Sequence, residues 1–549
     1  MPKRTQDDSI SEEPPQKRTR RSVEPDRLSA LSDELALHIL SFLPIRSLIT
    51  CQRVSHRFRI LAGDSELWKR KYYSRWILPR ARRVRQLTHV GAQSEPISYS
   101  ARVVKWLDHG RPWREEQEIN WMKEYRLQHN WSKGSCRVKE LEVAQPPIPP
   151  VLVNLHNGLV YTADARNGLR AWSVRDTETV LASFSLSEIS QSGIPTAMAV
   201  SSDEPTSKDN VVVGFENGSL AIYTLDRQTR SFMHRLTKFG SDDGEVTALS
   251  SCPGYVLVLF KSRMLCLYRL TSKPSLRLID SLQASNLRTP LTLSVRTAVR
   301  TDVIASIAYS FPRIGCGWSI GLQELRWNED GEKLGSHLAT PLDCQTFGSQ
   351  IGLKGAMKQS KNSASAFQQQ HTSSPYAFYM KPPTSLSYSH PYLLAAHADN
   401  TLTMYLVVSA ADRLTISPPH RLWGHTSSVS GVQVGGRGKA VSVSSRGDDI
   451  RIWELEDLVS SPLMTKMSRV RDRSIQLSPE RTKTQHTLVD LESRANVLLK
   501  IETDFWPAQK DISNQLTKIR GLVGFDDEQV VILREEDLGT QLLDCYDFT

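Results

Sequence analysis

The side chains that most often carry enzyme chemistry are present in this chain, but they form no catalytic or metal-binding motif. The seven cysteines are widely spaced without a CxxC pair, and the fourteen histidines are scattered. The sequence has no phosphate-binding glycine loop, no GxSxG nucleophile turn and no HExxH zinc helix. We therefore expect a chain that is not an enzyme and has no cofactor or metal, with free thiols rather than disulfides.

Cations in turns are the residues whose chemistry is most suggestive. Basic side chains recur between apolar runs at Arg166, Lys261, Arg263, Arg313, Arg446 and Arg534. The planar fork of arginine binds phosphate or carboxylate oxygens in pairs, so one hypothesis is a basic surface for an acidic or phosphorylated peptide. The alternative is chance, because turns are exposed and the net charge is +10. Arg534 is followed by two glutamates, which oppose its charge.

These turns need a scaffold that brings them to one surface. From about residue 136, short apolar runs alternate with turn residues at repeat scale, which predicts a β-propeller. Seven units are found at 159–174, 211–225, 256–270, 304–325, 393–407, 422–455 and 530–548. In this order, the turns before the last inner strand of each unit share one face. The last unit lacks an outermost strand, and we expect residues 136–143 to supply it and close the ring.

The unit at 422–455 resembles a WD repeat. It contains Gly424-His425 and ends in Ile452-Trp453. In that family the histidine pairs with an aspartate in the turn before the last strand. Gly447 occupies the usual position, so the resemblance assigns the role to Asp448, one residue later. We expect His425, Asp448 and Trp453 to be structural.

Two stretches are expected to interrupt the ring as largely disordered insertions, 329–383 and 457–517. The first is rich in Ser and Gln. The second contains Ser461-Pro462 and Ser478-Pro479, which proline-directed kinases could phosphorylate, although such dipeptides are common. It also has an amphipathic pattern near 486–501 that predicts a helix.

Residues 27–73 have the pattern of several short helices. Apolar residues recur at steps of four from Leu31 to Leu43, Pro44 ends the first helix, and Gly63-Asp64 precedes a short helix with Leu67-Trp68. A segment this small cannot bury a good core alone. It therefore packs either against the rest of this chain or against a partner.

This segment resembles an F-box, with Ser32 and Phe58 where the family more often has Pro and Trp. The resemblance implies that an apolar face docks on a Skp-type linker, and through it on cullin and RING subunits. The implied contact residues are Leu31, Leu35, Ile39, Leu40, Leu43, Pro44, Leu48, Val54, Phe58, Leu61 and Trp68. Docking by apolar burial should depend little on salt, whereas nucleic-acid binding should weaken steeply.

Residues 74–135 are basic and rich in tryptophan, which fits either a structural helical neck or base stacking on nucleic acid. We favour the neck. Residues 1–26 form a disordered basic tail with two basic clusters, the layout of a nuclear import signal or simply of a solvated tail. No apolar run of about 18 residues occurs, so we expect no membrane association and a location in the nucleus, the cytoplasm or both.

The sequence thus predicts a multidomain chain: a small all-α F-box at 27–73, a helical neck at 74–135, and an all-β seven-bladed WD-repeat propeller at 136–549. The predicted function is a non-catalytic adaptor that binds a protein substrate, phosphorylated or not, for an SCF-type ubiquitin ligase. The alternative is a nuclear propeller scaffold associated with nucleic acid or chromatin, although we do not expect nucleic acid as a partner.

Overall fold

The computed structural model describes most of the helical segment and the inner parts of the repeats. The described residues are 31–78, 119–144, 151–174, 180–186, 193–203, 208–240, 243–271, 275–284, 287–298, 302–313, 317–341, 381–435, 438–455 without 446 and 448, 474–480, 519–535 and 541–549. The predicted tail at 1–26, Ser461-Pro462 and the predicted helix near 486–501 lie outside them. The chain forms two compact units, Met1–Pro79 with Arg114–Tyr125, and Arg80–Trp113 with Arg126–Thr549.

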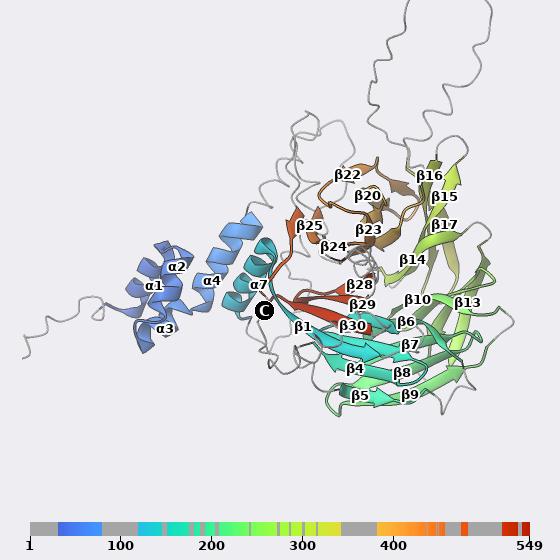
Figure 1. Cartoon of the computed structure of the whole chain (residues 1–549), viewed down its shortest axis with the longest axis horizontal. Coiled ribbons are helices and arrows are strands. Elements are labelled where there is room, and N and C mark those ends of the chain that lie inside the picture. The colour runs from blue at the N-terminus through green and yellow to red at the C-terminus, as the bar shows by residue number, and fades with distance from the viewer. Residues whose placement is uncertain are drawn as a thin grey trace, which may run out of the picture. The chain divides into compact units, whose positions relative to one another are not determined.

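The first unit is helical (Figure 1). Its elements are α1 (Asp33–Phe42), α2 (Ile45–Cys51), α3 (His56–Ala62), α4 (Ser65–Tyr72), the π-helical turn η1 (Tyr73–Ile77) and the start of α7 (Trp121–Lys133). The predicted breaks at Pro44 and Gly63-Asp64 are confirmed. Asp64 caps α4 by accepting a hydrogen bond from the Leu67 amide, and Ser55 caps α3 in the same way. None of the described helices is long and apolar enough to cross a membrane.

The second unit is a propeller of seven sheets, as predicted, and the strands pair antiparallel except for β1 with β27. The first three sheets are β2 (Leu152–His156), β3 (Leu159–Asp164), β4 (Gly168–Ser173), β5 (Val180–Phe184); β6 (Pro195–Asp203), β7 (Lys208–Phe215), β8 (Leu220–Asp226), β9 (Ser231–Lys238); and β10 (Val246–Cys252), β11 (Tyr255–Phe260), β12 (Met264–Leu270), β13 (Leu276–Gln283).

The next three sheets are β14 (Arg288–Thr297), β15 (Val303–Arg313), β16 (Gly317–Trp327), β17 (Lys333–Ala339); β18 (Ser385–Ser389), β19 (Tyr392–Ala396), β20 (Leu402–Ser409) with β21 (Leu414–Ile416) and β22 (His420–Leu422); and β23 (Val429–Val434), β24 (Lys439–Ser444), β25 (Ile450–Glu454), β26 (Ser474–Gln476). The seventh sheet contains β28 (Ile519–Phe525), β29 (Gln529–Glu535), β30 (Gln541–Asp547), β1 (Ser135–Ala144) and β27 (Ser478–Glu480).

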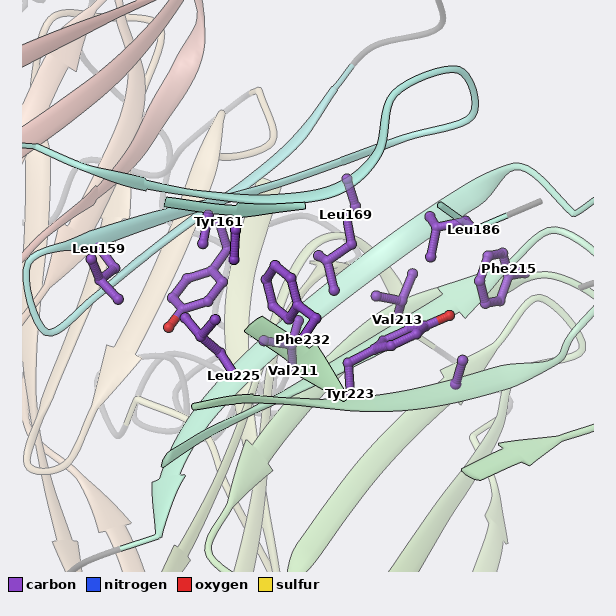
Figure 2. Close-up of a cluster of buried hydrophobic side chains, with 14 residues drawn as sticks. Leu159, Tyr161, Leu169, Leu186, Val211, Val213, Phe215, Tyr223, Leu225 and Phe232 are labelled. Carbon is purple, nitrogen blue, oxygen red and sulfur yellow. The ribbon is translucent and has the colours of Figure 1, made fainter. Parts of the chain in front are cut away.

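The core of the propeller lies between neighbouring sheets. The second strand of each blade is covered on both faces, so strands such as β3 and β11 are buried along their whole length and read as continuous apolar runs. Outer strands are more exposed and more polar, and in β9 half of the residues are exposed. Figure 2 shows one of these clusters, in which Tyr161 and Leu169 of the first blade pack with Val213 and Tyr223 of the second.

Ring closure follows the prediction. β1 pairs antiparallel with β30 from Arg137↔Asp547 to Ala144↔Gln541, so the strand that precedes the first blade completes the seventh. The two strands, cyan and red, lie side by side in Figure 1. β27 then pairs in parallel with the start of β1, Ser135 opposite Ser478. The seventh sheet therefore joins three distant parts of the sequence.

Both predicted insertions, 329–383 and 457–517, include residues that form strands of the propeller. Residues 333–339 form β17, the outermost strand of the fourth blade, and residues 474–480 contain β26 and β27. β17 and β26 are largely exposed or half-buried, and β17 alternates weakly in burial, so they lack the apolar run that marks the inner strands. Ser478-Pro479 consequently lies in a paired strand and not in an insertion.

Candidate docking and substrate-binding surfaces

The helical unit has a filled interior. Four of the predicted contact residues, Leu40, Leu48, Leu61 and Trp68, are buried there, and the Trp68 indole donates a hydrogen bond of 2.7 Å to the Ala62 carbonyl oxygen. Their spacing therefore reflects the core of this unit. Leu31, Leu43 and Phe58 are half-buried, and Pro44 is exposed at the N-cap of α2.

One face of α1 is apolar and uncovered. Leu35, Ile39 and Phe42 are 54%, 44% and 75% exposed and follow one another at steps of four and three residues, which places them in one stripe. Ala36 and Leu40 occupy the opposite, buried face of the same helix. An exposed apolar stripe on so small a unit is the usual mark of a docking surface.

Further exposed apolar residues extend over the neighbouring helices. Val54, a predicted contact, follows the end of α2 at Cys51, while Ile49 of α2 and Ile60 of α3 were not predicted. Phe42 was missed as well, although it continues the stripe that begins at Leu35. The helical spacing alone could have predicted that Phe42 is part of the exposed stripe. The exposure of Ile60 could be recognised only from the packing of α3, in which Leu61 points inward.

The aromatic residues of the predicted neck that the structure describes are buried or half-buried. In the first unit Trp121 and Tyr125 pack with Trp68 and Trp76, and the Arg75 guanidinium donates to the Tyr125 hydroxyl at 2.6 Å. This part of the chain therefore uses its tryptophans as packing groups. Trp106 and Trp113 lie outside the described residues.

The second half of α7 belongs to the propeller unit. Trp131 stacks on Phe548 with ring centroids 4.0 Å apart, and its indole donates to the Asp527 carbonyl oxygen at 2.8 Å. Asn130 donates to the Phe548 carbonyl oxygen, and Lys439 lies over the Trp131 ring. The second half of α7 thus packs where β28 turns into β29 and where β30 ends.

The predicted basic turns fall on the opposite face of the propeller. They join second to third strands, whereas α7 contacts a turn between first and second strands. Arg166, Lys261 and Arg263 are exposed in such turns, and Lys261 pairs with Glu245 at 3.1 Å. Arg313 is the last residue of β15, and Arg446 lies outside the described residues.

Arg534 differs from the prediction. It lies within β29 and not in a turn, because this strand continues to Glu535. Its guanidinium is 3.2 Å from Glu140 and 3.4 Å from Asp544, so neighbouring carboxylates balance its charge. Glu216 and Asp399 also lie in turns of this face. The face is therefore mixed in charge, with its described exposed cations in the first and third blades.

Trp423 is a feature of this face that was not predicted. It lies between β22 and β23, is 53% exposed, and has the Arg421 guanidinium 5.2 Å from its ring centre. Arg421 in turn pairs with Asp399 at 2.8 Å. An exposed tryptophan beside an arginine is typical of the anchors of protein interfaces. The only sequence signal was its place directly before Gly424-His425.

Two buried histidines hold turns of the propeller. His397 contacts Thr403 at 3.0 Å, and burial lowers the pKa of its imidazole to about 4, so it is neutral at physiological pH. His425 lies 2.6 Å from the Ser442 hydroxyl, which also accepts a hydrogen bond from the Trp453 indole. Both side chains are structural.

The carboxylate beside His425 corrects one assignment. Asp449 lies 3.1 Å from the imidazole Nδ1 and also contacts the Arg451 guanidinium at 3.0 Å, so this carboxylate has the role that the resemblance assigned to Asp448. Gly447, in the turn that precedes β25, adopts a positive φ of 74°, a conformation that favours glycine. Asp448 lies outside the described residues.

Comparison with known proteins agrees with this architecture. The fold and the exposed α1 stripe define the class, an F-box unit joined to a seven-bladed propeller. An F-box-like family model matches residues 30–74, and the model of the F-box protein pof12 beta-propeller matches residues 136–549. The chain belongs to this family of F-box proteins with a pof12-type propeller.

Several relatives support the assignment. F-box protein pof12 of Schizosaccharomyces pombe is 22% identical over 462 residues, which cover 81% of this chain and 90% of that protein. An F-box protein of Saccharomyces cerevisiae is 27% identical over 126 residues, 21% of this chain and 18% of that one. F-box protein dre-1 of Caenorhabditis elegans is 26% identical over 166 residues, 26% and 17% of the two chains.

Proposed function

We propose that this chain is the substrate-recognition adaptor of an SCF-type E3 ubiquitin ligase. Its F-box docks on a Skp-type linker, and its propeller binds a protein substrate. The observation that carries the proposal is the exposed stripe of Leu35, Ile39 and Phe42 on a helical unit whose own core is already filled. A stripe of this kind gains free energy by entering an apolar groove, at about 25 cal/mol for each Å² of apolar surface removed from water.

The predicted contact residues then divide into two roles. Leu35, Ile39 and Val54 are exposed and touch the linker directly, together with Phe42. Leu40, Leu48, Leu61 and Trp68 act indirectly, because their burial fixes the position of the helices that present the stripe. In this role the chain positions a substrate while other subunits of the ligase carry out the ubiquitin transfer.

The substrate is assigned to the propeller face that carries the turns between second and third strands. This face lies opposite the turns that Asn130 and Trp131 contact. Arg166, Arg263 and Trp423 are its exposed cationic and aromatic groups. They suit an acidic or phosphorylated segment with an apolar side chain. The proposed location is the nucleus, the cytoplasm or both.

The experiment is affinity purification of the full chain with substitutions on the stripe. Leu35→Ser/Ile39→Ser/Phe42→Ser should lose the linker and cullin while keeping substrate, because all three side chains are exposed and the fold does not depend on them. Leu334→Ser/Leu338→Ser, two exposed leucines on β17, is the matched control and should behave as wild type. Leu43 and Pro44 are poorer targets, since Leu43 packs on the core and Pro44 begins α2.

The result that would refute the adaptor proposal is equally direct. If the wild-type chain recovers neither linker nor cullin, the F-box has another partner. If the stripe variant recovers both at wild-type levels, the docking surface lies elsewhere. A nucleic-acid scaffold is less well supported, because Trp68, Trp121 and Trp131 are buried and their faces are not available for base stacking.

A further inference from the structure

We infer that the linker surface that receives this F-box is acidic around its apolar groove, so that cations of α2 and α3 steer and hold the complex. The inference rests on the proposed function, because it names the chemistry of the partner at the same docking surface. It arises from the charges that surround the exposed apolar residues of the first three helices.

The outer face of α2 alternates apolar and basic residues. Arg46, Ile49 and Arg53 are exposed and follow at steps of three and four, and Leu48 is buried on the opposite side. Arg46 and Ile49 therefore lie in one stripe on the exposed face of the helix. Arg53 follows α2 in the turn that also carries the exposed Val54.

The outer face of α3 has the same composition. His56, Arg59 and Ile60 are exposed, while Leu61 and Ala62 are buried. The other arginine of this helix, Arg57, is engaged within the unit, since its guanidinium lies 2.7 Å from the Asp33 carboxylate. Arg59 is thus the guanidinium that α3 directs outward beside an apolar side chain.

No carboxylate of this segment balances these cations. Residues 35–63 contain four arginines and no aspartate or glutamate. In the described residues, Arg46, Arg53 and Arg59 have no ion-pair partner. Asp33, just before this segment, pairs with Arg57. Beyond the first turn of α1, which carries the exposed Asp33 and Glu34, the exposed surface of the three helices is therefore apolar and cationic.

Such a surface restricts its partner. Three arginines brought against a neutral or basic protein surface lose hydration without gaining an opposite charge, which costs free energy. Their long aliphatic stems can cover apolar surface while the guanidinium groups reach the rim, where carboxylates would meet them. Apolar burial then supplies most of the affinity, and charge supplies the association rate and the specificity. This changes the expectation that linker docking is insensitive to salt.

The test compares two triple variants of the full chain with the same change in net charge. Arg46→Glu/Arg53→Glu/Arg59→Glu reverses the proposed face. Arg70→Glu/Arg126→Glu/Lys133→Glu reverses three exposed cations elsewhere on the described helices. Binding to the purified Skp-type linker of the same organism, and to a short DNA duplex, is measured by surface plasmon resonance at about 0.05 M and about 0.5 M NaCl, where screening lengths differ roughly threefold.

We expect the association rate of the wild type with the linker to fall about tenfold between the two salt concentrations. The α2/α3 variant should associate about tenfold more slowly at low salt and lose the salt dependence, with an unchanged melting temperature. The control variant should stay within about twofold of wild type. A wild type that binds no linker at either salt concentration refutes the proposed function itself.

Three other results would overturn the inference while leaving the proposed function intact. One is wild-type linker binding that is independent of salt. Another is an equal loss in both triple variants, which would assign the effect to net charge and not to this face. The third is loss of DNA binding in the α2/α3 variant with unchanged linker binding, which would make nucleic acid the partner of these arginines.

Discussion

Replacement of Trp131 tests how the propeller is completed. This side chain is 1% exposed, stacks on Phe548 at 4.0 Å, donates to the Asp527 carbonyl oxygen and lies under the Lys439 ammonium group. Removal of a buried tryptophan costs about 3–5 kcal/mol. An unsatisfied carbonyl adds about 1 kcal/mol. Because such contributions are not additive, we expect Trp131→Ala to destabilise the seventh blade by about 4 kcal/mol.

The assay must report on this blade alone, since a chain with two units does not unfold in a single step. Hydrogen exchange of peptides from β29 and β30, measured by mass spectrometry in the full chain, gives the local free energy of opening. Trp131→Phe keeps most of the ring contact and loses the hydrogen bond, so it should cost only about 1–2 kcal/mol.

Trp423→Ala removes an exposed tryptophan from the same unit and serves as the control, with an expected change within about 0.5 kcal/mol in the seventh blade. The reasoning is refuted if Trp131→Ala costs less than about 1 kcal/mol there. It is also refuted if Trp131→Phe is as damaging as the alanine variant, because the ring contact would then contribute nothing.

Three further changes have defined outcomes. Asp449→Ala should destabilise the sixth blade by about 3 kcal/mol in the same exchange assay, because it leaves His425 and Arg451 without their carboxylate; a larger effect of Asp448→Ala would contradict the assignment. The pKa of His397, lowered to about 4, predicts that the fifth blade loses stability as pH falls from about 6.5 to about 4, because the unfolded chain binds the proton at a higher pH than the folded chain. His397→Gln should remove this pH dependence when acid unfolding of the blade is followed by hydrogen exchange. Arg166→Glu/Arg263→Glu should reduce recovery of substrate proteins in pull-downs several-fold, whereas Arg230→Glu/Arg235→Glu, exposed in the β8–β9 turn and on β9, should leave the same set bound.

The sequence predicted best what is buried on two sides. The second and third strands of all seven blades carry apolar runs such as YVLVLF, and these are the units that the repeat pattern located. Outer strands face solvent on one side and carry little apolar signal, so β17 and β26 were assigned to insertions. In the helical unit, breaks and caps were visible because Pro44 and Asp64 have strong positional preferences.

Contact surfaces were harder to predict than the fold. Apolar spacing along a helix does not say which stripe faces inward, and so Leu40 and Leu48 were grouped with Leu35 and Ile39. Similarly, the charge on a turn residue does not reveal its neighbours, as the carboxylates around Arg534 show. The aspartate beside His425 is Asp449, one residue beyond the position that the family resemblance suggested, because the spacing of a degenerate repeat does not fix which carboxylate the turn brings to the imidazole.

The pairing of β1 with β30 has a consequence for how the protein is made. During synthesis β1 leaves the ribosome before any blade, and its partner is the last strand of the ring. Until residues 541–547 emerge, both β1 and β29 expose unpaired edges, the state in which strands associate with other chains. A stop codon at position 541 would therefore leave six complete blades and a seventh without β30, the strand that pairs with both β29 and β1. Such truncated products should be recovered as aggregates or bound to chaperones.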